Sequence, residues 1–320
     1  MKAGNVITWN RLGVSTQKSN RLKLQTIARL ALKTMSLFYR SFTLVTRFLG
    51  VSHSNSCSQE IGIPVPGKQV AQSVELPART SNWETDQESR GISKMSHLDE
   101  SKTDPVYYWL FLPTDYEVQA QSGGAPLLLF LHGGKWKNTP AELAKTKARN
   151  LPRLLDTPEF AKKFPSIAVA PLCKSGSMWS PSQLMLLLDH IEEKYKVDTN
   201  RVYVMGHSMG GFGTWMCLNK SPERFAAAVP ICGGGRPEWA GRLVKTPIWA
   251  FHGDNDSVVT IDNTENMVEA IKKAGGKKIR FTVYKGAGHD IGTQTYSNPM
   301  LYDWMFQQSL EGIGSINFEV

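Results

Sequence analysis

A serine stands between two glycines in the segment Gly206-His207-Ser208-Met209-Gly210. The residues just before it, 202–205, are β-branched, aromatic and apolar, and the residues after it read as a helix. The pattern G-x-S-x-G between a strand and a helix indicates a sharp turn that exposes the serine hydroxyl at the end of a sheet, beside the free N–H groups of a helix N-terminus. We therefore interpret Ser208 as a nucleophile. The alternative is an ordinary glycine-rich turn.

A serine hydroxyl needs a general base, and the base needs an orienting acid. An apolar run over residues 279–284 leads into Lys285-Gly286-Ala287-Gly288-His289, so we predict His289 as the base, with glycines clearing the approach. Another apolar run, residues 247–251, leads into Asp254 and Asp256. By position alone, either carboxylate reaches the imidazole, and the other would stabilise a turn.

A fourth element lies upstream, where the wholly apolar run 127–131 is typical of a strand buried on both faces and ends in His132-Gly133-Gly134. A tetrahedral intermediate needs two backbone N–H donors for its oxyanion. We predict the N–H groups of Met209 and Gly134 for that role, with His132 and His207 as supporting residues. The alternative for the upstream segment is a plain tight turn.

Taken together, residues from about 105 to 310 resemble an α/β-hydrolase. More narrowly, they resemble the esterase group that joins polyhydroxybutyrate-depolymerase-like and feruloyl-esterase-like proteins with the phospholipase/carboxylesterase and acyl-protein thioesterase families. The segments that carry the resemblance are Leu131-His132-Gly133-Gly134, Gly206-His207-Ser208-Met209-Gly210-Gly211-Phe212-Gly213-Thr214-Trp215, Pro222-Glu223-Arg224-Phe225-Ala226-Ala227, His252-Gly253-Asp254-Asn255-Asp256 and Gly288-His289.

The resemblance implies a serine esterase that cleaves carboxylic esters through an acyl-enzyme, without a metal or cofactor. It also implies that Asp256 is the acid of the triad and Asp254 a support. Two other functions stay open, a serine peptidase on the same fold and a non-catalytic binding protein. The chain departs from the group at Lys135-Trp136-Lys137, where many relatives have a glycine and an acidic residue.

Strand-like and helix-like segments alternate over residues 105–320, which predicts one α/β domain: a mostly parallel central sheet with helices on both faces. Only a short segment separates the strand ending near Ile231 from the one starting at Pro247. We therefore expect no large lid, and an open cleft for small-molecule or polymer-borne esters. Trp136, Trp179 and Trp239 either line an acyl or aryl pocket or pack in the core.

Residues 1–51 differ in character, with no acidic residue before Glu60, and they account for the net charge of +9. Apolar side chains recur at three- and four-residue steps over residues 24–49, with basic residues opposite, which indicates a basic amphipathic helix. It would contact a membrane surface or serve as a targeting presequence; a downstream start at Met35 and an inert tail are the alternatives. Whether the protein is exported or membrane-associated, or instead cytoplasmic, depends on which of these interpretations of the leader holds. Because the rest of the chain is charge-balanced, the basic pI is no argument for binding nucleic acid.

Residues 52–104 are rich in Ser, Gln, Glu, Pro and Gly, and we interpret them as a largely irregular linker. A chain that starts near residue 90 is accordingly expected to keep the whole hydrolase domain. The cysteines, Cys57, Cys173, Cys217 and Cys232, show neither metal-ligand spacing nor a disulfide framework.

Overall fold

The computed structural model describes residues 64–85, 94–134, 139–147, 149–173 and 178–311. The predicted leader, residues 1–51, lies outside these ranges, so its proposed membrane contact stays a prediction. All strands and helices of the described ranges belong to one compact unit, Gln59–Val320.

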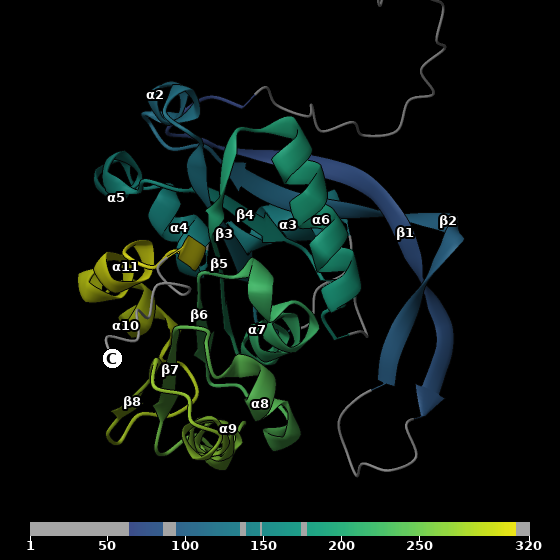
Figure 1. Cartoon of the computed structure of the whole chain (residues 1–320). Helices are drawn as coiled ribbons and strands as arrows, with labels where there is room; N and C mark the ends of the chain where they lie inside the picture. Colours follow the sequence, from purple (N-terminus) through teal and green to yellow (C-terminus); the bar gives the residue numbers. More distant parts are fainter. Residues whose placement is uncertain (1–63, 86–93, 135–138, 148, 174–177, 312–320) are drawn as a thin grey trace, which may run out of the picture. The chain divides into compact units, whose positions relative to one another are not determined.

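Within the described residues, eight strands form one sheet in the order β1-β2-β4-β3-β5-β6-β7-β8 (Figure 1). The strands are β1 Gln69–Thr85, β2 Lys94–Phe111, β3 Ala125–Leu131, β4 Ile167–Pro171, β5 Val197–His207, β6 Ala227–Ile231, β7 Ile248–Gly253 and β8 Ile279–Tyr284. β2 pairs antiparallel with β1 and with β4, and all other neighbours pair in parallel. The carboxyl ends of β3, β5, β6, β7 and β8 therefore meet at one edge of the sheet, where open α/β sheets place their functional groups.

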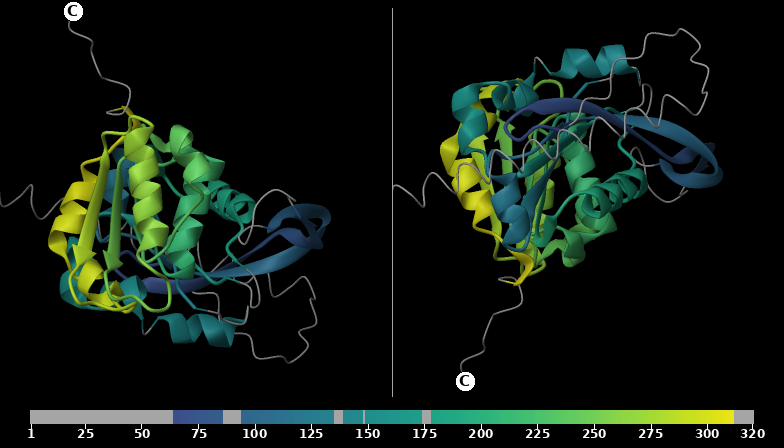
Figure 2. Two further views of the ribbon diagram at one scale, coloured as in Figure 1. Left: turned by 90° about the horizontal axis from the view of Figure 1, so that it is seen from below. Right: turned by 90° about the horizontal axis from the view of Figure 1, so that it is seen from above.

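Helices cover both faces of this sheet, as Figure 2 shows. Side chains of α6 (Pro181–Lys194), α7 (Met209–Lys220), α8 (Ala240–Leu243) and α9 (Asp262–Lys273) join one core cluster. Those of α4 (Asn150–Leu155), α5 (Pro158–Lys163), α10 (Gly292–Tyr296) and α11 (Pro299–Phe306) join the other. The remaining helical segments are α2 (Tyr116–Gln121), α3 (Pro140–Thr146) and the short 3₁₀ turns η1 (Pro222–Arg224) and η2 (Pro237–Trp239).

The central strands are apolar throughout because both of their faces are buried. Every residue of β3 is buried, and its side chains alternate between the clusters: Leu127 and Leu129 lie in one, Leu128 and Phe130 in the other. This is the two-residue period of a strand applied to a sheet with helices on each side. The predicted mostly parallel sheet with helices on both faces, the α/β-hydrolase architecture, is confirmed.

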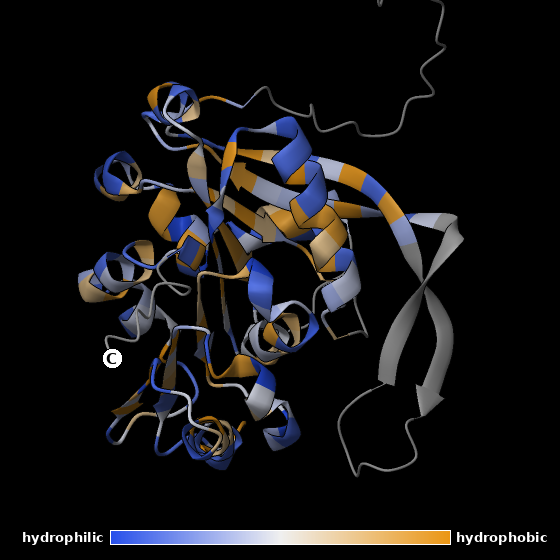
Figure 3. Cartoon of the chain, in the orientation of Figure 1, coloured by the Kyte–Doolittle hydropathy of each residue, from blue (hydrophilic) through white to orange (hydrophobic). Residues whose placement is uncertain are grey.

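The predicted boundary at residue 105 is wrong, because two long strands occupy much of the segment interpreted as a linker. β1 pairs with β2 from Gln69↔Phe111 onward, and Leu76 is buried in the core. β1 is an edge strand with one neighbour, so a few apolar residues suffice, and its alternating bands are visible in Figure 3. The polar residues between them gave the segment the composition of a linker.

The segment between β6 and β7 holds only η2 and α8, so the part of the chain that the structure describes carries no large lid there. Among the same residues, no helix is long and apolar enough to cross a membrane.

The start of α7 lies directly against the end of β3. A Cβ atom added at Gly210 would overlap the carbonyl oxygen of Leu131 and lie 2.6 Å from its carbonyl carbon. Because these are backbone atoms of a central strand, they cannot move aside cheaply. Glycine at this position is therefore a condition for seating α7 on the sheet.

We expect Gly210→Ala to lower the free energy of unfolding by about 3 kcal/mol or more, since overpacking against backbone exceeds the usual cost of an added methyl group. Gly241→Ala is the matched control, because an added Cβ on α8 meets nothing within 4 Å. It should leave stability equal or raise it by up to about 1 kcal/mol through helix propensity. Denaturant unfolding of both variants measures the difference, and equal effects would contradict the role of this close contact.

A second prediction concerns the position of β1. A chain that begins at Gln59 should keep the fold. A chain that begins at residue 90 loses β1, and with it the burial of Leu76 and one of the two strand partners of β2. We expect the shorter chain to be less stable by about 2 kcal/mol or more, the contribution of one large apolar side chain such as Leu76. Thermal unfolding of the two chains checks this, and equal melting temperatures would restore the boundary at residue 105.

Candidate active site

Ser208 occupies a strained turn between β5 and α7. Its backbone φ of 58° and ψ of −119° are unfavourable for a residue with a side chain, and its N–H donates to the Ile231 carbonyl at 2.8 Å. At Gly206, an added Cβ would lie 2.5 Å from the Gly210 carbonyl carbon. Glycine at 206 is thus required by its contact with Gly210, and glycine at 210 by its contact with Leu131 of β3. Strain that the surrounding structure maintains in this way is typical of functional sites.

The structure brings the three sequence-predicted catalytic side chains together in one hydrogen-bonded chain. His289 Nε2 lies 2.8 Å from Ser208 Oγ, and His289 Nδ1 lies 2.7 Å from Asp256 Oδ2. Ser208 follows β5, Asp256 follows β7 and His289 follows β8, so strand ends far apart in the sequence supply them. A base within 3 Å of a hydroxyl, itself oriented by a carboxylate, has the geometry needed to activate a serine.

The Asp256 carboxylate is buried and well supplied with donors. Its Oδ1 accepts from the backbone N–H groups of Val258 and Val259, both at 2.9 Å, while Oδ2 accepts from His289. Burial by itself raises the pKa of Asp256, but the hydrogen bonds from His289, Val259 and Val258 outweigh it and hold the pKa below its ordinary value. The group is therefore ionised at neutral pH and suited to stabilise an imidazolium.

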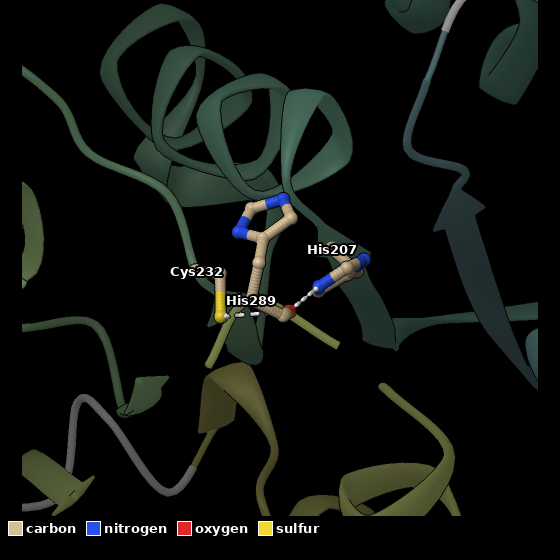
Figure 4. Close-up of side chains that lie close together, drawn as sticks. All are labelled: His207, Cys232 and His289. Atoms are coloured by element: carbon tan, nitrogen blue, oxygen red, sulfur yellow. Dashed lines mark hydrogen bonds between the residues drawn. The ribbon is translucent and has the colours of Figure 1, made fainter. Parts of the chain in front are cut away.

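Two further side chains hold the main chain of His289, as Figure 4 shows. His207 Nε2 donates to the His289 carbonyl at 2.8 Å, and the Cys232 thiol approaches the same oxygen at 3.6 Å. Burial lowers the pKa of His207 and raises the pKa of Cys232 to about 12, so both groups are neutral donors at pH 7. His207, predicted as a supporting residue, thus connects the serine turn with the backbone of His289.

The loop after β3 lies beside the serine. An ideal Cβ at Gly133 would lie 3.1 Å from Ser208 Cβ, and the next residue, Gly134, has a φ of 76° that favours glycine. Met209 is the first residue of α7, where the N–H has no partner within the helix. The two segments predicted to donate to an oxyanion are therefore adjacent. The donor role of Met209 and Gly134 stays a prediction.

His132, at the start of that loop, is hydrogen-bonded to the segment that follows β4. Its Nε2 accepts from the Cys173 N–H at 3.0 Å, and burial lowers the pKa of His132 to about 4, which keeps the ring neutral. The indole N–H of Trp179 donates to the His132 carbonyl at 3.3 Å. Trp179 is buried in the core, and the partly buried Trp239 packs against the same core cluster. Trp136 lies outside the described residues.

Asp254 has a different set of partners from Asp256. Its Oδ1 accepts from the Gly286 N–H at 2.6 Å, and Lys285 Nζ lies 3.3 Å from Oδ2. Both partners belong to the loop that leads from β8 to His289. Asp254 therefore connects the end of β7 with the loop that carries His289, and its supporting role in the reaction stays a prediction.

Two groups of potential metal ligands occur among the described residues: His207, Cys232 and His289, and Cys232, His252 and Asp256. Both ring nitrogens of His289 already face Ser208 and Asp256, and Asp256 is occupied by its four contacts with Val258, Val259, His289 and His252. The proximity of these side chains is therefore explained by the hydrogen bonds that hold His289 and Asp256 in place.

Sequence reasoning assigned no role to Cys232 or His252, although both lie within the site. Cys232 follows β6 with an unusual φ of 46°, and His252 is fully buried at the end of β7. The signal available in the sequence was their place one or two residues from the end of an apolar run, the same signal that identified Asp256 and His289.

Comparisons with known proteins agree with this geometry. Residues 177–298, which include Ser208, Asp256 and His289, match the Dienelactone hydrolase family. A solved structure titled as a thermostable esterase superposes with a TM-score of 0.58 at 31% identity, covering 66% of this chain and 61% of that one.

Two curated relatives match over shorter stretches. The bifunctional acetylxylan esterase/xylanase XynS20E of Neocallimastix patriciarum is 32% identical over 84 residues, 26% of this chain and 12% of that protein. The acylamino-acid-releasing enzyme of Arabidopsis thaliana is 25% identical over 152 residues, 44% of this chain and 20% of that protein. The chain thus spans a fifth or less of the length of these relatives. Together these findings show that the chain has the α/β-hydrolase fold and that the segment carrying the three site residues resembles the Dienelactone hydrolase family.

Proposed function

We propose that the protein is a serine esterase that hydrolyses carboxylic esters through an acyl-enzyme intermediate. The observation that carries this proposal is the continuous hydrogen-bonded chain from Asp256 through His289 to Ser208, with the serine on a strained turn at a helix N-terminus. The similarity to a solved esterase over two thirds of the chain and to part of an acetylxylan esterase supports an ester as the substrate.

The proposed reaction has two halves. Ser208 Oγ attacks the ester carbonyl while its proton passes to His289 Nε2, and the tetrahedral intermediate collapses as His289 returns that proton to the leaving alcohol. Water then attacks the acyl-serine, with His289 again taking and returning a proton, and releases the carboxylic acid. Asp256 keeps His289 Nδ1 protonated and stabilises the imidazolium in each half. The N–H groups of Met209 and Gly134 are proposed to bind the oxyanion.

A serine peptidase on the same fold is the second candidate, because the chain also resembles an acylamino-acid-releasing enzyme. The triad geometry serves both reactions, so the distinction depends on the leaving group that the site accepts. A panel of p-nitrophenyl esters of increasing acyl length, run beside acylated amino-acid anilides, separates them. Turnover of the anilides above that of every ester would favour the peptidase.

Ser208→Ala should lower turnover of any accepted ester roughly 10⁶-fold, since it removes the atom that attacks the carbonyl. The melting temperature should change little, because one hydroxyl at the end of the sheet contributes little packing. Hydrolysis rates and labelling by a fluorophosphonate provide the measurement. Labelling of the wild type at a serine other than Ser208 would refute the assignment.

The two aspartates provide a matched pair of variants. Asp256→Asn should lower turnover roughly 10⁴-fold, because an amide no longer holds the productive tautomer of His289. Asp254→Asn should cost less than about tenfold, since an amide oxygen still accepts from Gly286. If Asp254→Asn proves the more damaging change while both variants stay folded, the acid has been assigned to the wrong residue.

A further inference from the structure

A second histidine lies on the far side of the triad carboxylate. His252, at the end of β7, has no exposed surface, and its Nε2 lies 3.2 Å from Asp256 Oδ2, the same oxygen that accepts from His289. Nε2 also lies 2.8 Å from the Val259 carbonyl oxygen. A carboxylate and a carbonyl can only accept, so Nε2 must carry a proton and donate to them.

The other ring nitrogen leads away from the triad. His252 Nδ1 lies 2.7 Å from Thr264 Oγ1 on α9, and that hydroxyl donates to the Gly233 carbonyl at 2.6 Å. A hydroxyl has one proton, and when it is donated to the Gly233 carbonyl, Thr264 is an acceptor toward the ring. In that arrangement Nδ1 also carries a proton, and the ring is an imidazolium.

The surroundings suit a buried positive charge at His252. The loop after β7 supplies the Asp256 carboxylate, α9 supplies the uncharged Thr264, and β6 is followed by Cys232, whose burial keeps its thiol neutral. A buried cation is tolerated when it is paired and hydrogen-bonded, and both conditions are met here.

The same series of hydrogen bonds ends beside the helix that follows the nucleophile. An added Cβ at Gly233 would lie 2.6 Å from the Phe212 backbone nitrogen and 2.8 Å from the Gly211 Cα, so Gly233 lies directly against the first turn of α7. Asp256, His252, Thr264 and Gly233 thus connect the acid of the triad to the helix that carries Ser208.

We propose, on the basis of the proposed function, that His252 is a positioning residue of the triad: doubly protonated, it holds the Asp256 carboxylate toward His289 and ties it through Thr264 to the nucleophile helix. His252 touches no substrate. Its loss should therefore lower kcat and leave KM nearly unchanged, because only the alignment of the base is affected.

The first experiment measures kcat and KM for a p-nitrophenyl ester in the wild type, His252→Leu, His252→Gln, Thr264→Val and Thr146→Val. His252→Leu should lower kcat about 100-fold with KM within about threefold, a loss typical of a small misplacement of a catalytic group. His252→Gln keeps a donor near Nε2 and should recover about tenfold of that loss. Thr146→Val is the control, a buried threonine on α3 whose hydroxyl bonds to Leu143, and its kcat should stay unchanged. Melting temperatures identify any variant that does not fold. If His252→Leu does not fold, the kcat values of Thr264→Val and His252→Gln test the proposal in its place.

The charge has its own readout in the pH profile of kcat/KM. A cation at His252 opposes proton uptake by His289, so the neutral His252→Gln should move the acid limb to higher pH by about one unit. An unmoved limb, or an unchanged kcat in folded His252→Leu, would overturn the proposal.

A spectroscopic measurement separates this proposal from the proposed function, because it needs no substrate. Long-range ¹H–¹⁵N spectra of the full chain report the protonation of each imidazole nitrogen, and His252→Gln assigns the resonances. Both nitrogens of His252 should be protonated at neutral pH in wild type, and one unprotonated nitrogen would overturn the proposal. Absence of ester turnover in the wild type would instead refute the esterase assignment and leave this result standing.

Discussion

The close approach of α7 to the end of β3 is the constraint on which the site depends. Neither Gly206 nor Gly210 has room for a Cβ atom, so the chain reverses sharply between β5 and α7 and Ser208 takes a strained conformation. The strain is maintained because Gly206 and Gly210 contact backbone atoms of α7 and β3, which cannot move aside. It places the serine hydroxyl where the ends of β7 and β8 bring Asp256 and His289.

Around this turn, the buried polar groups are arranged so that each acceptor meets a donor. The Asp256 carboxylate accepts from two backbone N–H groups and from two imidazoles, and the His289 carbonyl accepts from His207 and Cys232. Unpaired polar groups in such a place would be costly, so the network also restricts how far any member can move. The base of the triad is consequently held both by its ring and by its main chain.

Burial divides the ionisable groups of the site into charged and neutral members. Hydrogen bonds overcome the effect of burial at Asp256, which stays ionised, whereas burial prevails at His132 and His207, which stay neutral. This division matters because a triad needs one fixed negative charge and one group that changes its proton. A positive His252 beside Asp256 would add a second fixed charge, which tunes how readily His289 takes up its proton.

The sequence by itself determined the fold class and the catalytic candidates, because both depend on local patterns. Wholly apolar runs such as β3 indicate a sheet buried on both faces, and the glycines around Ser208 indicate the sharp turn. His289 and Asp256 follow from the rule that functional groups lie at strand ends, although choosing Asp256 over Asp254 required a family resemblance. Only the tertiary structure decided the extent of the domain and showed that His252 and Cys232 lie beside the triad. β1 was missed because an edge strand needs few apolar residues, so its composition resembles a linker. The support of the triad was missed because hydrogen bonds between the ends of β6, β7 and α9 join residues separated in sequence, and no local pattern records them.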